Sequence, residues 1–201
     1  MSWQEIAVPK YPKGDSDDAV SLTLMWVMAA GGADQPGRLW AGTLPGGLFR
    51  SDDKGDHWSL VTSLWDMEDR KKWFGGGADE PGIHSICVDP RNSSRIAVAV
   101  SCGGVWLTED DGETWTVASK GMWAEYVPAE AKYDPVTQDP HCMAQCVSAP
   151  DTYWVQHHNA IFRCTDNLVS WHEVTDVPAS NFGFPVAVHP KDPDTAWFVP
   201  A

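Results

Sequence analysis

The octapeptide SDDKGDHW at residues 51–58 returns twice more along the chain. TEDDGETW stands at residues 108–115, and a weaker copy, CTDNLVSW, stands at residues 164–171, so the copies begin 57 and then 56 positions apart. The residues before the copies (GGLFR, GGVWL and NAIFR) and after them (SLVTS, TVASK and HEVTD) also match. Self-similarity at an even spacing predicts a repeated supersecondary unit.

Each repeat reads as four short strands. On both sides of each octapeptide apolar and polar residues alternate between turn signals such as Asp-Pro and Gly-Gly, which is typical of β-strands. In the second repeat we predict strands near residues 83–88, 95–101, 104–108 and 114–118. Four-stranded units of this length are typical of propeller blades arranged around a central channel.

We therefore predict an all-β protein, a β-propeller of four-stranded antiparallel blades in a single domain spanning residues 1–201. The predicted parts are an outer strand at 2–8, blades at 19–63, 83–119 and 141–176, and the start of a further blade at 182–201. These parts make about three and a half blades, which cannot close a ring and would leave sheet edges unpaired. We expect a ring of six to eight blades completed by further C-terminal sequence, with closure by self-association as the alternative.

The pattern S/T-x-D-x-G-x-x-W resembles the Asp-box, or BNR repeat, of sialidase-like, xyloglucanase-like and sortilin-like propellers and of a photosystem-assembly factor. The resemblance covers nearly the whole chain and implies the propeller fold. It does not fix an activity, because the superfamily contains glycosyl hydrolases and proteins without catalysis. It implies a structural role for Ser51, Asp53, Gly55, Trp58, Thr108, Asp110, Gly112, Trp115, Asp166 and Trp171.

The octapeptide also has a physical rationale as a hairpin turn. Its Asp can accept hydrogen bonds from turn N–H groups, its Ser or Thr can close the turn from the other side, and its Gly permits a positive φ. Its Trp can pack between blades. In the third copy Cys164 replaces the hydroxyl and Leu168 the glycine, so we predict a different turn backbone there. A calcium loop is excluded, because it would need more carboxylates and a terminal Glu.

Two long connections carry the candidate ligand-binding residues. In a propeller the octapeptide turns share one face, and the connections 64–82 and 120–140 lie on the other. Long loops in compact domains are usually functional or mobile. Aromatic rings beside carboxylates suit sugars, by stacking and by hydrogen bonding to hydroxyls. The candidates in the two loops are Trp65, Asp66, Asp69, Arg70, Trp73, Trp123, Glu125, Tyr126 and Asp134.

Two histidines extend this candidate site. His84 and His141 each begin an inner strand directly after a long loop, and inner strands line the channel. With Glu80, Asp134 or Asp139 nearby they could hold a metal ion. Our expectation is that they hydrogen-bond the loop backbone instead, so we predict no metal and no cofactor. His157-His158 lies at a turn on the same face.

We predict binding of a glycan or another extended ligand on this face, with a non-catalytic protein-interaction scaffold as the alternative. Glycoside hydrolysis would need two suitably separated carboxylates. True sialidase activity is disfavoured, because in that family three arginines clamp the substrate carboxylate, and the elaborated loops contain only Arg70.

The composition and the N-terminal sequence narrow the possible binding partners and the cellular location. Twenty-eight acidic residues against 14 basic ones give a net charge of −14, which would repel nucleic acid and anionic membranes. The N-terminus, MSWQEIAVPK, lacks the pattern of a secretion signal, so we expect a cytoplasmic protein, with a removed signal as the alternative. We read the five cysteines as reduced thiols.

Overall fold

The structure, a computed structural model, describes residues 3, 5–13, 20–177 and 180–201. It holds three four-stranded antiparallel sheets and one two-stranded sheet, each with its strands in sequence order. We call each sheet a blade. The strands of the first blade are β1 (Leu24–Ala30), β2 (Leu39–Leu44), β3 (Leu48–Ser51) and β4 (Ser59–Leu60). Those of the second are β5 (Ile83–Val88), β6 (Ile96–Val100), β7 (Gly104–Thr108) and β8 (Thr116–Val117).

The third blade has the strands β9 (Pro140–Gln145), β10 (Tyr153–His157), β11 (Ile161–Cys164) and β12 (His172–Glu173). The last sheet has β13 (Gly183–Val188) and β14 (Ala196–Pro200). Short helices interrupt the connections: α1 (Thr62–Trp65), η1 (Glu68–Lys72) and η2 (Ala129–Ala131). None of the helices in the described ranges has the length and apolar character that a membrane span requires.

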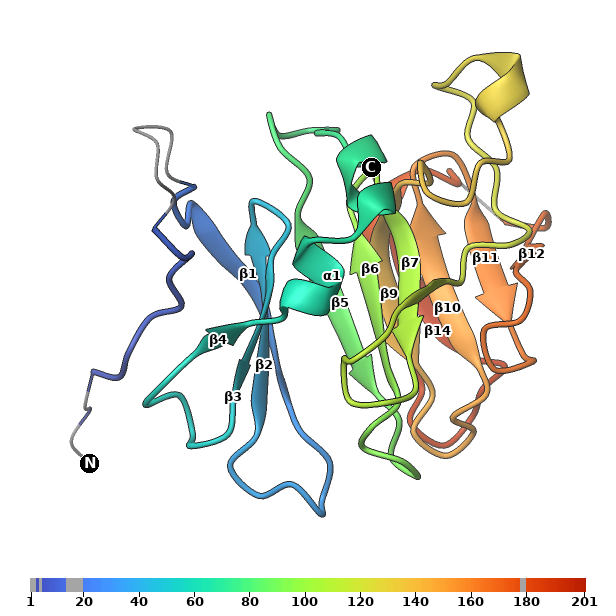
Figure 1. The fold of residues 1–201 in the computed structure, drawn as a ribbon. Coiled ribbons are helices and arrows are strands. Elements are labelled where there is room, and N and C mark those ends of the chain that lie inside the picture. Colours follow the sequence, from blue (N-terminus) through green and yellow to red (C-terminus); the bar gives the residue numbers. More distant parts are fainter. Residues whose placement is uncertain (1–2, 4, 14–19, 178–179) are drawn as a thin grey trace.

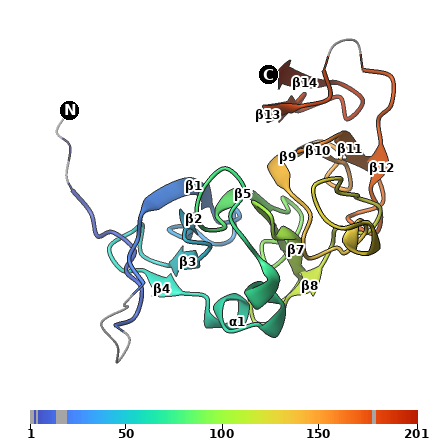
Figure 2. The ribbon, with the colours of Figure 1, turned by 90° about the horizontal axis from the view of Figure 1, so that it is seen from above.

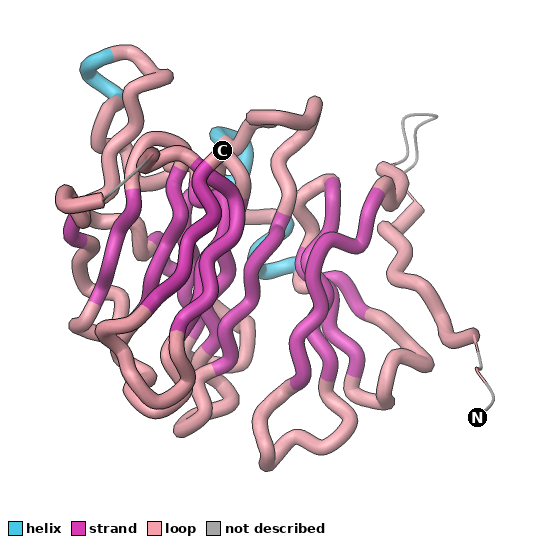
Figure 3. The backbone as a smooth tube through the Cα atoms, turned by 180° about the vertical axis from the view of Figure 1, so that it is seen from behind, coloured by secondary structure: helices cyan, strands magenta, loops and turns pink. Residues whose placement is uncertain are grey.

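The blades follow one another around an arc that does not close (Figure 2). The first strands of successive blades, β1, β5, β9 and β13, lie side by side on the inside of the arc. The regular elements are mostly strands, and the helices are confined to the connections (Figure 3). The prediction of an all-β fold with about three and a half antiparallel blades is confirmed. The predicted strands of the second blade correspond to β5–β8.

The core lies between the blades. Along β6, Ile96, Val98 and Val100 pack toward the first blade, whereas Ala97 and Ala99 pack toward the third. This follows from the period of two in a strand, because successive side chains point to opposite faces. All five residues are buried, so the apolar run IAVAV is a strand covered on both faces.

The three octapeptide turns have the same hydrogen-bonding scheme. The side chain at the first position accepts from the N–H four residues on: Gly55 to Ser51 at 2.8 Å and Gly112 to Thr108 at 2.9 Å. The carboxylate at the third position likewise accepts from the N–H four residues on, in the second copy Thr114 to Asp110 at 2.9 Å. Figure 1 shows the turn between β3 and β4 at the lower end of the molecule, away from the yellow loop that carries η2.

The third turn keeps this backbone, and the prediction of a different one is wrong. Asn167 and Leu168 have φ of 62° and 70°, close to Asp111 and Gly112 at 63° and 89°. The thiol of Cys164 replaces the hydroxyl and accepts from the Leu168 N–H at 3.1 Å. A left-handed non-glycine residue costs about 1–2 kcal/mol, and burying a leucine returns a similar or larger amount. Leu168 is buried in the core between blades, which offsets its backbone strain.

The octapeptide tryptophans join neighbouring blades. The indole N–H of Trp171 donates to the carbonyl of Ala118, just after β8, at 2.7 Å, and that of Trp115 donates to the hydroxyl of Ser63, after β4, at 3.2 Å. Trp58 donates to the carbonyl of Ala7 at 3.0 Å. Each turn is therefore tied to the segment that precedes its own blade.

The N-terminal segment makes this contact without forming the strand predicted over residues 2–8. Among the described residues of that range, 3 and 5–8, none is assigned to a strand. Residues 2 and 4 lie outside the described part of the chain. Ala7 meets the indole of Trp58 much as Ala118 meets that of Trp171, so the segment is held by the tryptophan rather than by strand pairing.

Candidate functional site

A cavity of about 460 Å³ opens on the face opposite the octapeptide turns, and we call it the loop-face cavity. It is lined by Phe74, Gly75, Gly76, Gly77, Cys102, Tyr126, Asp139, His141, His158, Phe182 and Phe184. Most of these residues belong to the connections between blades or to the turns between the second and third strands of a blade. The cavity is therefore lined in part by residues of both long connections, 64–82 and 120–140.

A second cavity of about 360 Å³ adjoins the first and shares Gly77, Asp139, His141 and Phe184 with it. It reaches the buried His84, whose Nδ1 lies 2.9 Å from the hydroxyl of Ser85. The Nε2 atom of His84 has no hydrogen-bond partner among the described residues. Burial lowers the pKa of His84 to about 4, so this imidazole is neutral at physiological pH.

Asp139 stands where the two cavities meet and is 4% exposed. Its backbone N–H donates to Nε2 of His157 at 3.1 Å, and its carbonyl accepts from the N–H of His158 at 2.9 Å. Its Oδ1 accepts from the backbone N–H of Cys102 at 3.0 Å. The first two bonds hold the backbone of Asp139, and the third holds its carboxylate.

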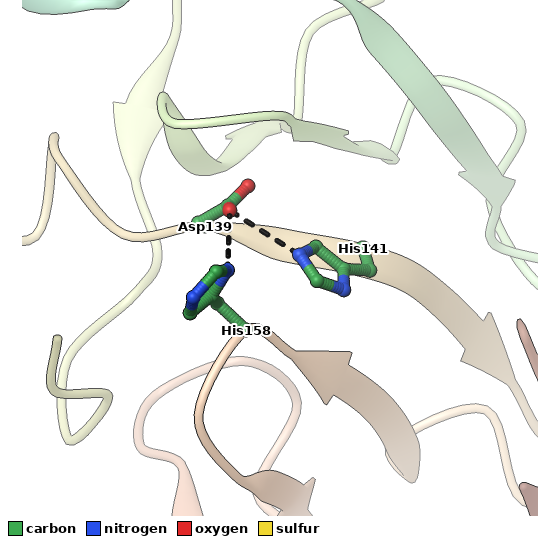
Figure 4. A group of neighbouring side chains, drawn as sticks. All are labelled: Asp139, His141 and His158. Atoms are coloured by element: carbon green, nitrogen blue, oxygen red, sulfur yellow. Dashed lines mark hydrogen bonds and ion pairs between the residues drawn. The ribbon is translucent and has the colours of Figure 1, made fainter. Parts of the chain in front are cut away.

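The other carboxylate oxygen, Oδ2, faces two imidazoles (Figure 4). Nε2 of His141 lies 3.3 Å from it and Nδ1 of His158 lies 3.4 Å from it. Asp139 and His141 flank Pro140 at the start of β9, and His158 directly follows the end of β10. A strand start and a turn of the same blade thus converge on one oxygen.

Electrostatics couples Asp139 to His141. Burial alone would raise the pKa of Asp139, but hydrogen bonding and charge from His141 outweigh it and hold that pKa below its usual value. Burial would lower the pKa of His141, and the hydrogen bond to Asp139 reverses this and raises it. The pair therefore favours an imidazolium beside a carboxylate.

Aromatic rings surround this polar cluster. Phe184 stacks on the His141 ring with centroids 4.8 Å apart and planes 14° apart, and Phe182 meets the same ring edge-on at 5.6 Å. Tyr126 packs against His158 at 5.0 Å and donates its hydroxyl to the carbonyl of Thr137 at 3.0 Å. The cavity thus combines apolar walls with a few convergent polar groups, which is the usual character of a ligand pocket.

The run Gly75-Gly76-Gly77 lets a loop close over the carboxylate. A Cβ on Gly76 would lie 2.9 Å from the sulfur of Cys102 and 3.5 Å from Oδ2 of Asp139. A Cβ on Gly77 would meet nothing within 4 Å. Only the first of these two positions is therefore crowded against the polar cluster.

Of the predicted ligand-binding residues, the structure brings Tyr126 and His141 to the loop-face cavity and His84 to its neighbour. Trp73, another predicted ligand-binding residue, is 7% exposed and packs against Trp106 with centroids 5.8 Å apart. Trp65 is half-buried against Tyr11 and under the guanidinium of Arg70 at 3.4 Å. These loops fold back on the blades, because their rings complete the core.

The remaining candidates also lie outside both cavities. Trp123 donates its indole N–H to Glu173 at 2.8 Å. Asp69 pairs with Lys72, and Asp134 accepts from the N–H of Val136 within its own loop. The predicted ligand-binding residues that line neither cavity are Trp65, Asp66, Asp69, Arg70, Trp73, Trp123, Glu125 and Asp134.

Sequence reasoning gave too little weight to Asp139, His158 and the phenylalanines at 74, 182 and 184. One signal was available: Asp139 and His141 are two positions apart at a strand start and therefore point to the same side. The proximity of His158 depends on how the blade folds and has no local signal.

No family model matches the chain. It is similar to two curated enzymes. It is 30% identical over 105 residues to a probable oligoxyloglucan-reducing end-specific xyloglucanase of Neosartorya fischeri, and this match covers 52% of the chain and 12% of the relative. It is 32% identical over 78 residues to the oligoxyloglucan-reducing end-specific xyloglucanase of Emericella nidulans, which covers 38% of the chain and 8% of that enzyme. The matches thus span about a tenth of the length of these relatives.

Superposition on solved structures supports the fold. The GH74 xyloglucanase from Xanthomonas campestris superposes with a TM-score of 0.61 at 22% identity, over 84% of this chain and 25% of that one. An ancestral GH74 enzyme superposes with a TM-score of 0.59 at 14% identity, over 85% of this chain and 21% of that one. The fold is a β-propeller. At these identities the likeness concerns the fold alone.

Proposed function

We propose that this propeller is of the glycosyl-hydrolase-like type and binds a glycan in the loop-face cavity, opposite the octapeptide turns. The observation that carries the proposal is the arrangement in that cavity of aromatic rings around buried polar groups. Phe74 and Phe184 are partly exposed there, and Tyr126 forms a half-buried wall beside His158. No arginine lines either cavity in the described part of the chain, which argues against an anionic sugar such as sialic acid.

This arrangement suits a neutral sugar. Pyranose rings present apolar C–H faces that pack on aromatic rings, and their hydroxyls need donors and acceptors at the edge. Phe184 offers a face at the cavity wall and is 56% exposed. Asp139, His141 and His158 offer polar atoms a short distance away. An extended chain would cross from this cavity into the neighbouring one over their shared residues.

The cavity supports binding better than hydrolysis. The usual glycoside hydrolases flank the scissile bond with two carboxyl groups. Asp139 is the one carboxylate that lines either cavity in the described ranges. We therefore propose recognition of the glycan by these residues, without cleavage by them.

We further infer that the octapeptide turns are Asp boxes of the BNR type with a purely structural role. Their shared hydrogen bonds and left-handed residues support this assignment. The similarity to two xyloglucanases supports xyloglucan oligosaccharides as the first ligand to test.

Isothermal titration calorimetry with xyloglucan oligosaccharides tests the proposal. We expect saturable binding at one site and no increase in reducing ends on incubation. Absence of binding to these and to unbranched β-glucan oligosaccharides would overturn it and leave the protein-interaction scaffold as the better hypothesis. Release of new reducing ends would contradict the restriction to binding.

A further inference from the structure

We propose that Asp139, His141 and His158 bind one divalent transition-metal ion, with an open coordination position facing the loop-face cavity. One ligand atom from each residue lies within 4.8 Å of the other two. Two imidazoles and one carboxylate are a donor set that zinc and iron(II) accept. The proposal goes beyond glycan binding and does not depend on it.

The distances fit a tetrahedral ion. Zn–N and Zn–O bonds of about 2.0–2.2 Å place neighbouring ligand atoms of a tetrahedron about 3.3 Å apart. Oδ2 of Asp139 lies 3.3 Å from Nε2 of His141 and 3.4 Å from Nδ1 of His158. Two of the three edges therefore already have the required length, and small rotations of the two rings would complete the third.

The tautomer of His141 is set for metal binding. Its Nδ1 lies 2.7 Å from the carbonyl oxygen of Gly183, which can only accept, so Nδ1 donates a proton there. In the neutral ring Nε2 then carries a lone pair and faces the carboxylate. A backbone carbonyl behind a metal-binding histidine is a common outer partner that fixes tautomer and orientation. In the absence of an ion, a second proton on His141 makes the Nε2–Oδ2 contact an ion pair, and a bound cation would take the place of that proton.

Asp139 is held in the same manner. Its Oδ1 is occupied by the backbone N–H of Cys102, which leaves Oδ2 for the imidazoles. A simple ion pair would need one imidazole, and the structure provides two on the same oxygen. The backbone bond from His158 to the Asp139 carbonyl keeps the second ring there. The fourth direction opens to the cavity that all three residues line.

Zinc titration of tag-free, chelator-treated protein tests this inference without any glycan present. We expect one Zn²⁺ per chain and a melting temperature that rises with zinc, since an ion that binds the folded state stabilises it. Asp139→Asn keeps an acceptor for the Cys102 N–H and removes the charge. His158→Gln changes a side chain that is 40% exposed and removes one ligand. Each variant should weaken zinc binding about 100-fold or more, because loss of an outer partner alone costs 10- to 100-fold.

His172→Gln is the matched control, because His172 is exposed on β12 and lies outside the cluster. It should bind zinc like the wild type. A melting curve recorded without metal shows whether each variant is folded. If Asp139→Asn does not fold, His158→Gln alone tests the proposal. No zinc binding by the wild type at micromolar concentrations would overturn the proposal, as would unchanged affinity in folded His158→Gln.

Discussion

The indole N–H of Trp171 donates a 2.7 Å hydrogen bond to the carbonyl oxygen of Ala118, joining the turn of the third blade to the outer edge of the second. Trp171 is buried in the core between these blades. The bond and the packing act together, because the ring fills the interface and its single polar atom is satisfied there.

Trp171→Ala should therefore lower the free energy of unfolding by about 3–5 kcal/mol, as for other buried aromatic residues. Trp58→Ala should cost less, because Trp58 is only partly buried. Trp171→Phe keeps most of the packing and leaves the Ala118 carbonyl unpaired, so an intermediate loss is expected. Urea unfolding measures all three, and a larger loss for Trp58→Ala than for Trp171→Ala would contradict the account.

Gly112→Ala tests the backbone of the octapeptide turn. Gly112 has a φ of 89°, and a Cβ there would have ordinary contacts at 3.5 Å or more. The cost is thus conformational, about 1–2 kcal/mol. Gly77→Ala is the control, because its φ lies outside the left-handed range and its Cβ would enter open space, so unfolding should change by less than about 0.5 kcal/mol. Equal stability of the two variants would argue against a left-handed turn.

The turn carboxylates predict loss of stability in acid. Hydrogen bonds from the side chain and backbone N–H of Thr114 lower the pKa of Asp110 to about 2, and bonds from His57 do the same for Asp53. An unfolded Asp has a pKa of about 3.9, so the unfolded chain binds the proton more readily. The stabilisation is complete above about pH 4 and is lost as pH falls through about 2.

Asp110→Asn isolates this effect, since other groups titrate equally in both proteins. The variant should melt below the wild type at pH 5 to 7, and the difference should shrink as pH approaches 2. Melting temperatures across this range provide the measurement. A difference that stays constant with pH would show that the charge of Asp110 does not matter.

The blades could be predicted from the sequence because the signals for their strands and turns are local. The apolar run Ile96–Val100 and the repeated octapeptide predict a strand and a turn at their positions. The backbone of the third turn was mispredicted at Leu168. The missing glycine is visible in the local sequence, whereas the burial of the leucine, which offsets the backbone strain, is not. Trp73 was predicted to bind ligand for the same reason: its packing partner, Trp106, belongs to the next blade along the chain and gives no local signal.

The candidate site was likewise predictable only in part from the sequence. His141 could be placed at the inner start of a strand from its position after a long loop. Its meeting with His158 could not, because it depends on the pairing of β9 with β10 and on the bond between the His158 N–H and the Asp139 carbonyl.

The central claim is that the loop-face cavity is the ligand site, and a matched pair of variants tests it most directly. Phe184 and Trp197 lie on the last sheet and are 56% and 54% exposed, but only Phe184 lines the cavity. Calorimetric titration with a xyloglucan oligosaccharide should show about tenfold weaker binding for Phe184→Ala, equivalent to about 1.4 kcal/mol, and unchanged binding for Trp197→Ala. Unchanged affinity in folded Phe184→Ala, or loss of binding only in Trp197→Ala, would contradict the claim.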